Sequence, residues 1–289
     1  MNENTNFTYI KKYIESSYFN YDEISAYSDK KIDKYIQKTH NRFKIEATDW
    51  NYDKNNFWVL RLYASLKMLL SSTVFYSHYE FSEEQKTYLS LPYHEYYGLI
   101  SSCRALLLLS SDKEEFSIIF SATHSNIIKS TTQLLQSIDI NLANKFDKHI
   151  TSLKENRERF SYHLPTKKIL NEDIEKTFND SIGFSRIIAE LTQLNSEILE
   201  KNVDTESDNQ YFVFGNIQAF DKDIFQYFNS DEDYHRLGYI VRKVKRPINI
   251  HLLATEGLTE DFLGNYMEEY TEENQLGALH NLQLIFPFD

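Results

Sequence analysis

The sequence predicts a mainly α-helical protein with a small mixed unit at its C-terminal end. Glycine and proline are scarce, at 7 and 4 of 289 residues, so tight turns should be few. Between about residues 56 and 200, apolar residues recur at helical spacing in long runs. Beyond residue 210 the apolar runs become short and rich in Tyr, Phe, Val and Ile, which is typical of strands. We therefore divide the chain into an N-terminal helical extension, a helical bundle and a small α+β unit, which span residues 1–55, 56–200 and 201–289.

Composition and charge exclude several classes of protein. The single Cys103 excludes a disulfide framework and a cysteine-rich zinc site. No apolar run reaches the roughly 18 residues of a membrane span, and the start M-N-E-N-T-N lacks the order of a signal peptide. We therefore expect a cytoplasmic protein that does not contact a membrane. Residues 201–289 carry 7 Lys and Arg against 16 Asp and Glu, out of a net charge of −12. This acidity favours solubility and would confine any RNA contact to the helical part.

The N-terminal extension should consist of short polar helices. Its clearest amphipathic piece is T-N-F-T-Y-I-K-K-Y-I-E. Tyrosines and charged side chains are frequent here, and they bury an apolar body while keeping a polar tip in water. We expect this extension to cover the later helices, because it cannot form a core alone.

The bundle should begin with a helix over residues 56–79, where apolar residues recur with a helical period (Trp58, Leu62, Leu66, Leu69, Leu70). The next helix, residues 91–110, is apolar on all sides and should be nearly central. A row of small residues on it would admit a neighbouring helix closely (Gly98, Ser101, Ser102, Ala105). On the same helix, Tyr97 and Arg104 are interpreted as packing and salt-bridge residues.

Two further helices should complete the bundle around the one that carries Arg157. The shorter, residues 117–135, contains His124, which we expect to cap a helix or to hydrogen-bond rather than to bind a metal. After Pro165, Asn171 can cap a last long helix, whose first turn holds Glu172 and Asp173.

The helix around residues 142–162 breaks its own apolar pattern at Arg157. Leu142, Phe146, Ile150 and Leu153 form one stripe, and Arg157 comes next on it, all five within an arc of roughly 80° at about 100° per residue. A buried arginine needs a partner or a task. His163 precedes Leu164-Pro165, so it should lie at the helix end or in the following loop. An arginine on a bundle face beside a histidine could perform acid/base chemistry on a phosphate.

Three segments, in this order, resemble the HEPN superfamily. H-E-Y-Y-G-L-I-S-S-C-R-A-L-L-L-L resembles its Tyr-Tyr, small-residue, Arg-Ala-Leu-Leu helix. A-T-H-S-N-I-I resembles its Thr-His segment, and L-K-E-N-R-E-R-F-S-Y-H its Leu, Arg, Asp-Tyr segment, although Glu158 and Ser161 differ from the family pattern. The resemblance covers residues 56–200. It implies a helical bundle that often dimerises and, in active members, a metal-independent endoribonuclease.

The family motif is an arginine followed after about four to six residues by a histidine, and five residues separate Arg157 from His163. The resemblance implies that His163 assists proton transfer while an RNA 2′-hydroxyl attacks its own phosphate, and that Arg157 stabilises the transition state. Neighbouring side chains would bind the substrate (Lys154, Arg159, Tyr162, Lys167, Lys168). RNA is then the expected partner, a homodimer through the bundle the expected assembly, and no metal or other cofactor is expected. A toxin or phage-defence effector fits this description.

Other members of the superfamily are inactive partners or scaffolds, so a second hypothesis stands beside the first. It is a non-catalytic helical interaction module that binds a protein partner such as an antitoxin or a nucleotidyltransferase. A third is an unassigned structural subunit. The first two differ in whether Arg157 and His163 converge in one open cleft.

The C-terminal unit should begin after a polar linker at residues 201–210. Four short runs predict strands, and one longer run between the last two predicts a helix (Y-F-V-F-G, Y-I-V-R-K-V, I-N-I-H-L-L-A-T, L-Q-L-I-F-P-F; T-E-D-F-L-G-N-Y-M-E-E-Y). The basic run R-K-V-K-R-P is then interpreted as an edge strand guarded by Lys and Arg, with an RNA contact as the alternative.

Overall fold

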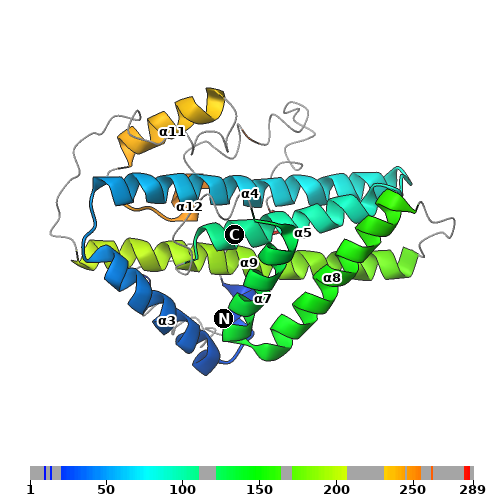
Figure 1. Ribbon diagram of the computed structural model, residues 1–289, viewed down its shortest axis with the longest axis horizontal. Coiled ribbons are helices and arrows are strands. Elements are labelled where there is room, and N and C mark those ends of the chain that lie inside the picture. The colour runs from blue at the N-terminus through cyan, green and yellow to red at the C-terminus, as the bar shows by residue number, and fades with distance from the viewer. Residues whose placement is uncertain are drawn as a thin grey trace, which may run out of the picture.

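The computed structural model describes residues 10, 14, 21–110, 122–163, 171–206, 231–244, 246–254, 262 and 283–286. All regular secondary structure in these ranges is helical, which confirms the prediction of a mainly α protein. Two long helices, α4 (Tyr52–Glu84) and α9 (Asn171–Glu206), run along the long axis of the molecule (Figure 1). The other main helices are α3 (Asp29–Ala47), α5 (Leu91–Leu108), α7 (His124–Ile138) and α8 (Ile140–Tyr162). None of the helices in the described ranges has the length and apolar composition needed to cross a bilayer.

Helix α5 is the central element, as its apolar sequence predicts. It packs against α4, α7, α8 and α9. The row of small residues faces α4, where Ser102 Oγ donates a hydrogen bond to Ser72 Oγ at 2.8 Å and Ser65 Oγ donates to the Ala105 carbonyl at 2.9 Å. A Cβ atom added at Gly98 would lie 2.6 Å from Cε1 of Tyr76. The close approach of α4 and α5 therefore requires glycine at this position.

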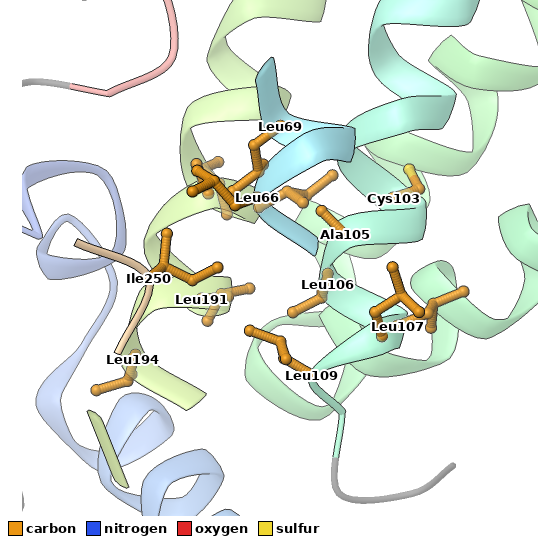
Figure 2. Packing of buried hydrophobic residues seen from close by; sticks show 14 of the residues in the cluster. Leu66, Leu69, Cys103, Ala105, Leu106, Leu107, Leu109, Leu191, Leu194 and Ile250 are labelled. Atoms are coloured by element: carbon orange, nitrogen blue, oxygen red, sulfur yellow. The ribbon is translucent and has the colours of Figure 1, made fainter. Parts of the chain in front are cut away.

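The apolar core forms where α4, α5 and α9 meet. Figure 2 shows Leu66 and Leu69 of α4 beside Leu106 of α5 and Leu191 of α9, all of which are fully buried. The short helix α12 (Ile250–Leu253) adds Ile250 to the same core. Each such side chain stabilises the fold by about 1.5–3 kcal/mol relative to its exposure in water.

Helices α7 and α8 form a hairpin around one capping residue. Asp139 ends α7, and its side chain accepts hydrogen bonds from the backbone N–H groups of Asn141 at 2.8 Å and Leu142 at 2.9 Å. These are the donors that a helix start leaves unpaired. Lys31 of α3 forms an ion pair with the same carboxylate. The hairpin thereby fixes the direction of α8 and the position of every residue on it.

The N-terminal helices cover the bundle, as predicted. Helix α3 packs against α7 and α9, and Tyr35 on it donates a hydrogen bond to Asn195 Oδ1 at 2.9 Å. The buried carboxylate of Glu190 accepts hydrogen bonds from the N–H groups of Glu23 and Ile24 at 2.9 and 2.7 Å, and so caps the short helix α2 (Asp22–Ser25). The first bundle helix begins at Tyr52 and not at residue 56.

The strands predicted near residues 239–244 and 248–255 are wrong, because both segments are helical. Helix α11 (Asp231–Lys243) includes the first, and α12 occupies the second. In α11 the buried residues recur at helical spacing (Asp233, Leu237, Ile240, Val241), with acidic residues in the first turn and basic residues in the last, as the helix dipole favours. Arg242 and Lys243 therefore end a helix and do not guard an edge strand. Residues 284 and 285 of the last predicted strand form a turn and residue 283 is helical, so the described part of this segment is not a strand. The predicted strand at 211–215 lies outside the described residues, as does all but Phe262 of the predicted helix at 259–270.

Candidate functional site

Arg157 lies on α8 and faces α5. The stripe before it is buried as predicted (Leu142, Phe146, Ile150, Leu153). The guanidinium Nη1 donates a hydrogen bond to the Tyr97 hydroxyl at 3.2 Å, and the guanidinium carbon lies 5.0 Å from the centre of the Tyr96 ring. The side chain of Arg157 retains 17% exposure. It therefore lines the surface of the bundle between α5 and α8, with one side open.

Among the described residues, the ion pair of Arg157 is with Glu158, and this pair is weak. Its Nη2 lies 3.2 Å from Oε1 of Glu158, a side chain that is 42% exposed. An ion pair between such neighbours at a protein surface contributes about 0–1 kcal/mol. The buried Nε of Arg157 has no hydrogen-bond partner. Arg157 thus keeps hydrogen-bonding capacity that the described part of the chain does not use.

Arg104, two helical turns after Tyr97 on α5, brings a second guanidinium to the same region. Its Nε is also buried without a partner, and no described carboxylate forms an ion pair with it. Burial lowers the pKa of Arg104, and the adjoining Tyr96 and Tyr97 act in the opposite direction. Arg61 on α4 provides a contrast, because its buried guanidinium donates to the carbonyl oxygens of Leu108 and Ser110 at 2.6 and 3.0 Å. Arg61 closes the end of α5, whereas Arg104 has no comparable structural task. The expected salt bridge of Arg104 is absent among the described residues.

His124 joins these two arginines at the start of α7. Thr123 caps this helix by accepting a hydrogen bond from the Asn126 N–H at 3.3 Å, and this places His124 on the first turn. Its Nδ1 lies 3.0 Å from the Tyr96 hydroxyl, which confirms a hydrogen-bonding role for this histidine. Burial lowers the pKa of His124, and the positive charges of Arg104, Arg157 and Lys154 lower it further. The imidazole is therefore neutral near pH 7 and can accept a proton.

Lys154 adds a fourth basic group, one turn before Arg157 on α8. Its Nζ donates a hydrogen bond to Ser125 Oγ at 3.3 Å and so bridges α8 to the first turn of α7. We call Arg104, His124, Lys154 and Arg157 the Arg157 cluster. The side chains come from three helices, and Tyr96 and Tyr97 lie among them.

The electrostatics of the Arg157 cluster favour an anion. Three cationic side chains gather around His124, and the adjacent Tyr96 hydroxyl is neutral, since burial raises the pKa of Tyr96 to about 12. Gathering like charges costs free energy unless a partner offsets it. Guanidinium groups bind phosphate oxygens through paired N–H donors, and a neutral imidazole can exchange a proton with a bound substrate.

The remaining predicted site residues lie apart from the cluster. Arg159 and Tyr162 are exposed near the end of α8, Tyr162 at 77%, while Lys167 and Lys168 fall outside the described residues. His163 is the exposed C-cap of α8, and its N–H donates to the Arg159 carbonyl at 2.9 Å. Six residues of helix correspond to about 9 Å along the axis and roughly 240° around it. The structure records no contact between the side chains of Arg157 and His163, so their pairing across a dimer stays a prediction.

The two positions that depart from the HEPN pattern have local partners. Glu158 pairs with Arg157, as described above. Ser161 Oγ donates a hydrogen bond to the Arg157 carbonyl at 2.8 Å and accepts one from the Tyr93 hydroxyl at 2.8 Å. Ser161 therefore ties the last turn of α8 to α5.

Sequence reasoning missed the convergence of Arg104 and His124 on Arg157. These residues are 20 to 53 positions apart in the chain, and only the packing of α5, α7 and α8 unites them. The sequence contains one local indication of the site, the Tyr96-Tyr97 pair two turns before Arg104. In the structure both rings contact the Arg157 guanidinium. Among the described residues, no group of three His, Cys, Asp or Glu side chains is arranged to hold a metal ion.

Comparison with known proteins yields no relative. No protein-family model matches the chain, and neither does any curated protein or any solved structure. The HEPN resemblance therefore rests on the quoted motifs alone.

Proposed function

We propose that the chain is a metal-independent endoribonuclease that binds a phosphate of RNA at the Arg157 cluster. The observation that carries this proposal is the convergence of two guanidinium groups with unused donors on a neutral histidine. The HEPN resemblance supports the same class of reaction.

The proposed reaction is an attack by the RNA on its own backbone. The 2′-hydroxyl gives its proton to a neutral imidazole, and its oxygen forms a bond to the adjacent phosphorus. The bond from phosphorus to the 5′-oxygen of the next nucleotide then breaks, and this oxygen takes up a proton from the imidazolium formed in the first transfer or from water. Arg157 and Arg104 would stabilise the negative charge that develops on the phosphate oxygens. The products are a 2′,3′-cyclic phosphate and a 5′-hydroxyl, and DNA is inert because it lacks the nucleophile.

Two histidines compete for the role of proton acceptor. The motif resemblance favours His163, which would have to reach the phosphate across a dimer. The geometry favours His124, because its ring hydrogen-bonds to Tyr96 and lies in the field of Arg157. We assign the role to His124 and retain His163 as the assignment of the motif.

The test is cleavage of total RNA and of a matched DNA by the purified full chain in EDTA. We expect the wild type to cleave RNA only, and His124→Ala to lower the rate by about 10²–10⁴, the usual effect of removing a general base. His235→Ala, at an exposed position on α11, serves as the control and should leave the rate unchanged. Loss of cleavage in His163→Ala alone would instead support the motif assignment. Intact RNA with the wild-type chain would contradict the ribonuclease proposal.

The second candidate function is a non-catalytic module that binds another protein, and a surface feature favours it. A groove of about 410 Å³ lies between the start of α5 and the end of α8 and is lined by Thr87, Leu89, Ser90, Tyr93, Phe160 and Ser161. Leu89 is 55% exposed, and Phe81 and Tyr162, on the last turns of α4 and α8, are 61% and 77% exposed. Exposed apolar side chains of this size favour a protein interface. The partner would be a second copy of the chain, an antitoxin or a nucleotidyltransferase.

A further inference from the structure

A row of aromatic rings leads from the Arg157 cluster to a pocket between α4 and α5. The Tyr97 ring, which contacts Arg157, stacks on Phe75 with 5.8 Å between ring centres and 28° between ring planes. Phe75 in turn lies 6.4 Å from the His94 ring, and His94 stacks on His78 at 5.6 Å. The cationic cluster and the pocket are thus joined by one continuous aromatic surface.

The pocket has the size and lining of a small-ligand site. Its volume is about 330 Å³, at the lower end of the roughly 300–1,000 Å³ of such sites. Its walls are mostly apolar and are formed by Ser71, Val74, Phe75, His78, His94 and Phe262. A flat aromatic ligand can stack on such rings, and stacking is tolerant of sequence because every nucleobase has a π-face.

His94, which lines this pocket, has one polar atom without a partner. Nδ1 of His94 is buried and makes no hydrogen bond. A buried polar group left in this state destabilises the free protein, and a ligand that hydrogen-bonds to it would relieve that cost. Burial and the neighbouring His78 lower the pKa of His94, so its ring is neutral near pH 7 and offers one donor and one acceptor. The edge of a nucleobase carries complementary groups.

A purely structural role does not account for the position of these rings. Phe75 and His94 are only half-buried and His78 is exposed, so the row reaches the molecular surface rather than ending in the core. Phe75 differs in this from Trp58, Leu66 and Tyr76 of the same helix, which are fully buried. The aromatic row therefore remains accessible from solvent beside a set of cations.

We infer that the pocket of Phe75, His78 and His94 binds one nucleobase of a single-stranded RNA whose phosphate occupies the Arg157 cluster. This inference rests on the proposed function, because it names the form of the substrate. Phe75 and Tyr97 supply the stacking surface and His94 the hydrogen bonds to the base edge, while the guanidinium groups hold the backbone. Duplex RNA is excluded from this mode, since its bases are paired and stacked.

The test compares two short probes that the chain cannot cleave. One is a single-stranded RNA with 2′-O-methyl groups, and the other is an abasic oligomer of the same length, which offers phosphates without bases. We expect the wild type to bind the first about tenfold or more tightly than the second, as measured by titration calorimetry. Phe75→Leu should abolish this preference while leaving the affinity for the abasic oligomer unchanged. Tyr234→Leu, at an exposed position on α11 away from the pocket, is the control and should behave as the wild type.

The outcomes separate this inference from the proposed catalysis. A base preference that depends on Phe75, in a chain that leaves RNA intact, would support the pocket and contradict the nuclease. Equal affinity of the wild type for both probes, or no binding of either, would overturn the pocket. The pocket would also be overturned by a base preference that neither Phe75→Leu nor His78→Ala changes. Cleavage activity could persist in any of these cases.

Discussion

At the scale of single residues, three buried carboxyl groups on α5 and α9 set a pH dependence of stability. Burial raises the pKa of Glu95 and of Glu190 to about 8, and that of Glu197 to about 7. Glu95 accepts one hydrogen bond, from Ser181 Oγ at 2.8 Å, and the same hydroxyl lies 2.7 Å from Nε2 of His149. The hydrogen bond from Ser181 by itself lowers the pKa of Glu95, so burial outweighs it and favours the protonated carboxyl.

Stability should therefore fall as the pH rises. In the unfolded chain such a carboxyl has a pKa near 4.5, well below about 8 in the folded chain. Between these values the folded state holds an extra proton, so raising the pH favours unfolding, by up to about 1.4 kcal/mol per pH unit for each group. Glu95→Gln should flatten the decline between pH 5 and 8, as measured by urea unfolding at several pH values. Glu155→Gln, at an exposed position on α8, should not. Parallel pH profiles for wild type and Glu95→Gln would contradict a protonated Glu95.

At the scale of the helix pair, the contact between α4 and α5 depends on the absence of a side chain at Gly98. Gly98→Ala would bring a Cβ atom to 2.6 Å from the Tyr76 ring, whose hydroxyl is held by Ser185 Oγ at 2.6 Å. Tyr76 cannot move freely, so the helices must separate. We expect a loss of about 1–3 kcal/mol in the free energy of unfolding, the usual cost of overpacking a core.

The control for this change is another glycine in a helix. A Cβ atom added at Gly183 on α9 would meet nothing within 4 Å. Gly183→Ala should therefore stabilise the chain by about 0.5–1 kcal/mol through reduced backbone entropy. Denaturant unfolding of both variants gives the comparison, and effects of the same sign and similar size at the two sites would be inconsistent with this packing.

Elements of the bundle could be predicted from sequence, whereas those near the C-terminus could not. Helices α4, α5 and α8 carry several turns of apolar residues, so a period of 3.6 dominates any local preference. The run at residues 239–244 contains Tyr, Ile and Val, whose local preference is for strands. It is helical because Leu237, Ile240 and Val241 form one buried face, and because Asp233 of α11 accepts hydrogen bonds from Tyr63 and Lys67 of α4. Tertiary packing decides the outcome in so short a segment.

At the scale of the whole molecule, the candidate site could likewise be predicted from the sequence only in part. The orientation of Arg157 could be predicted, because it follows from the stripe on its own helix. Its partners could not, since Tyr96, Tyr97, Arg104 and His124 come from other helices and the interaction is a property of their packing. The HEPN-like spacing indicated His163, which is the C-cap of the helix that carries Arg157 and follows Arg157 by six residues, or roughly 240° around the helix axis.

The assembly of the molecule should involve the end at which α4 finishes, α5 begins and α8 finishes (Figure 1). Phe81, Leu89 and Tyr162 are exposed there, beside the groove described above, and His163 is adjacent to Tyr162. A symmetric dimer through this surface would cover these apolar side chains and bring His163 of each copy to the interface.

We therefore expect light scattering to show a homodimer at tens of micromolar, and the double variant Phe81→Ser, Tyr162→Ser to shift it to a monomer without a change in helix content. The matched control is Ile45→Ser near the end of α3, an apolar side chain that is equally exposed but does not line the groove, and this change should leave the dimer intact. A wild-type monomer at this concentration would exclude a homodimer through this surface. A dimer that survives the double variant would place the interface elsewhere on the bundle, and the route by which His163 could approach the partner's Arg157 cluster would then be lost.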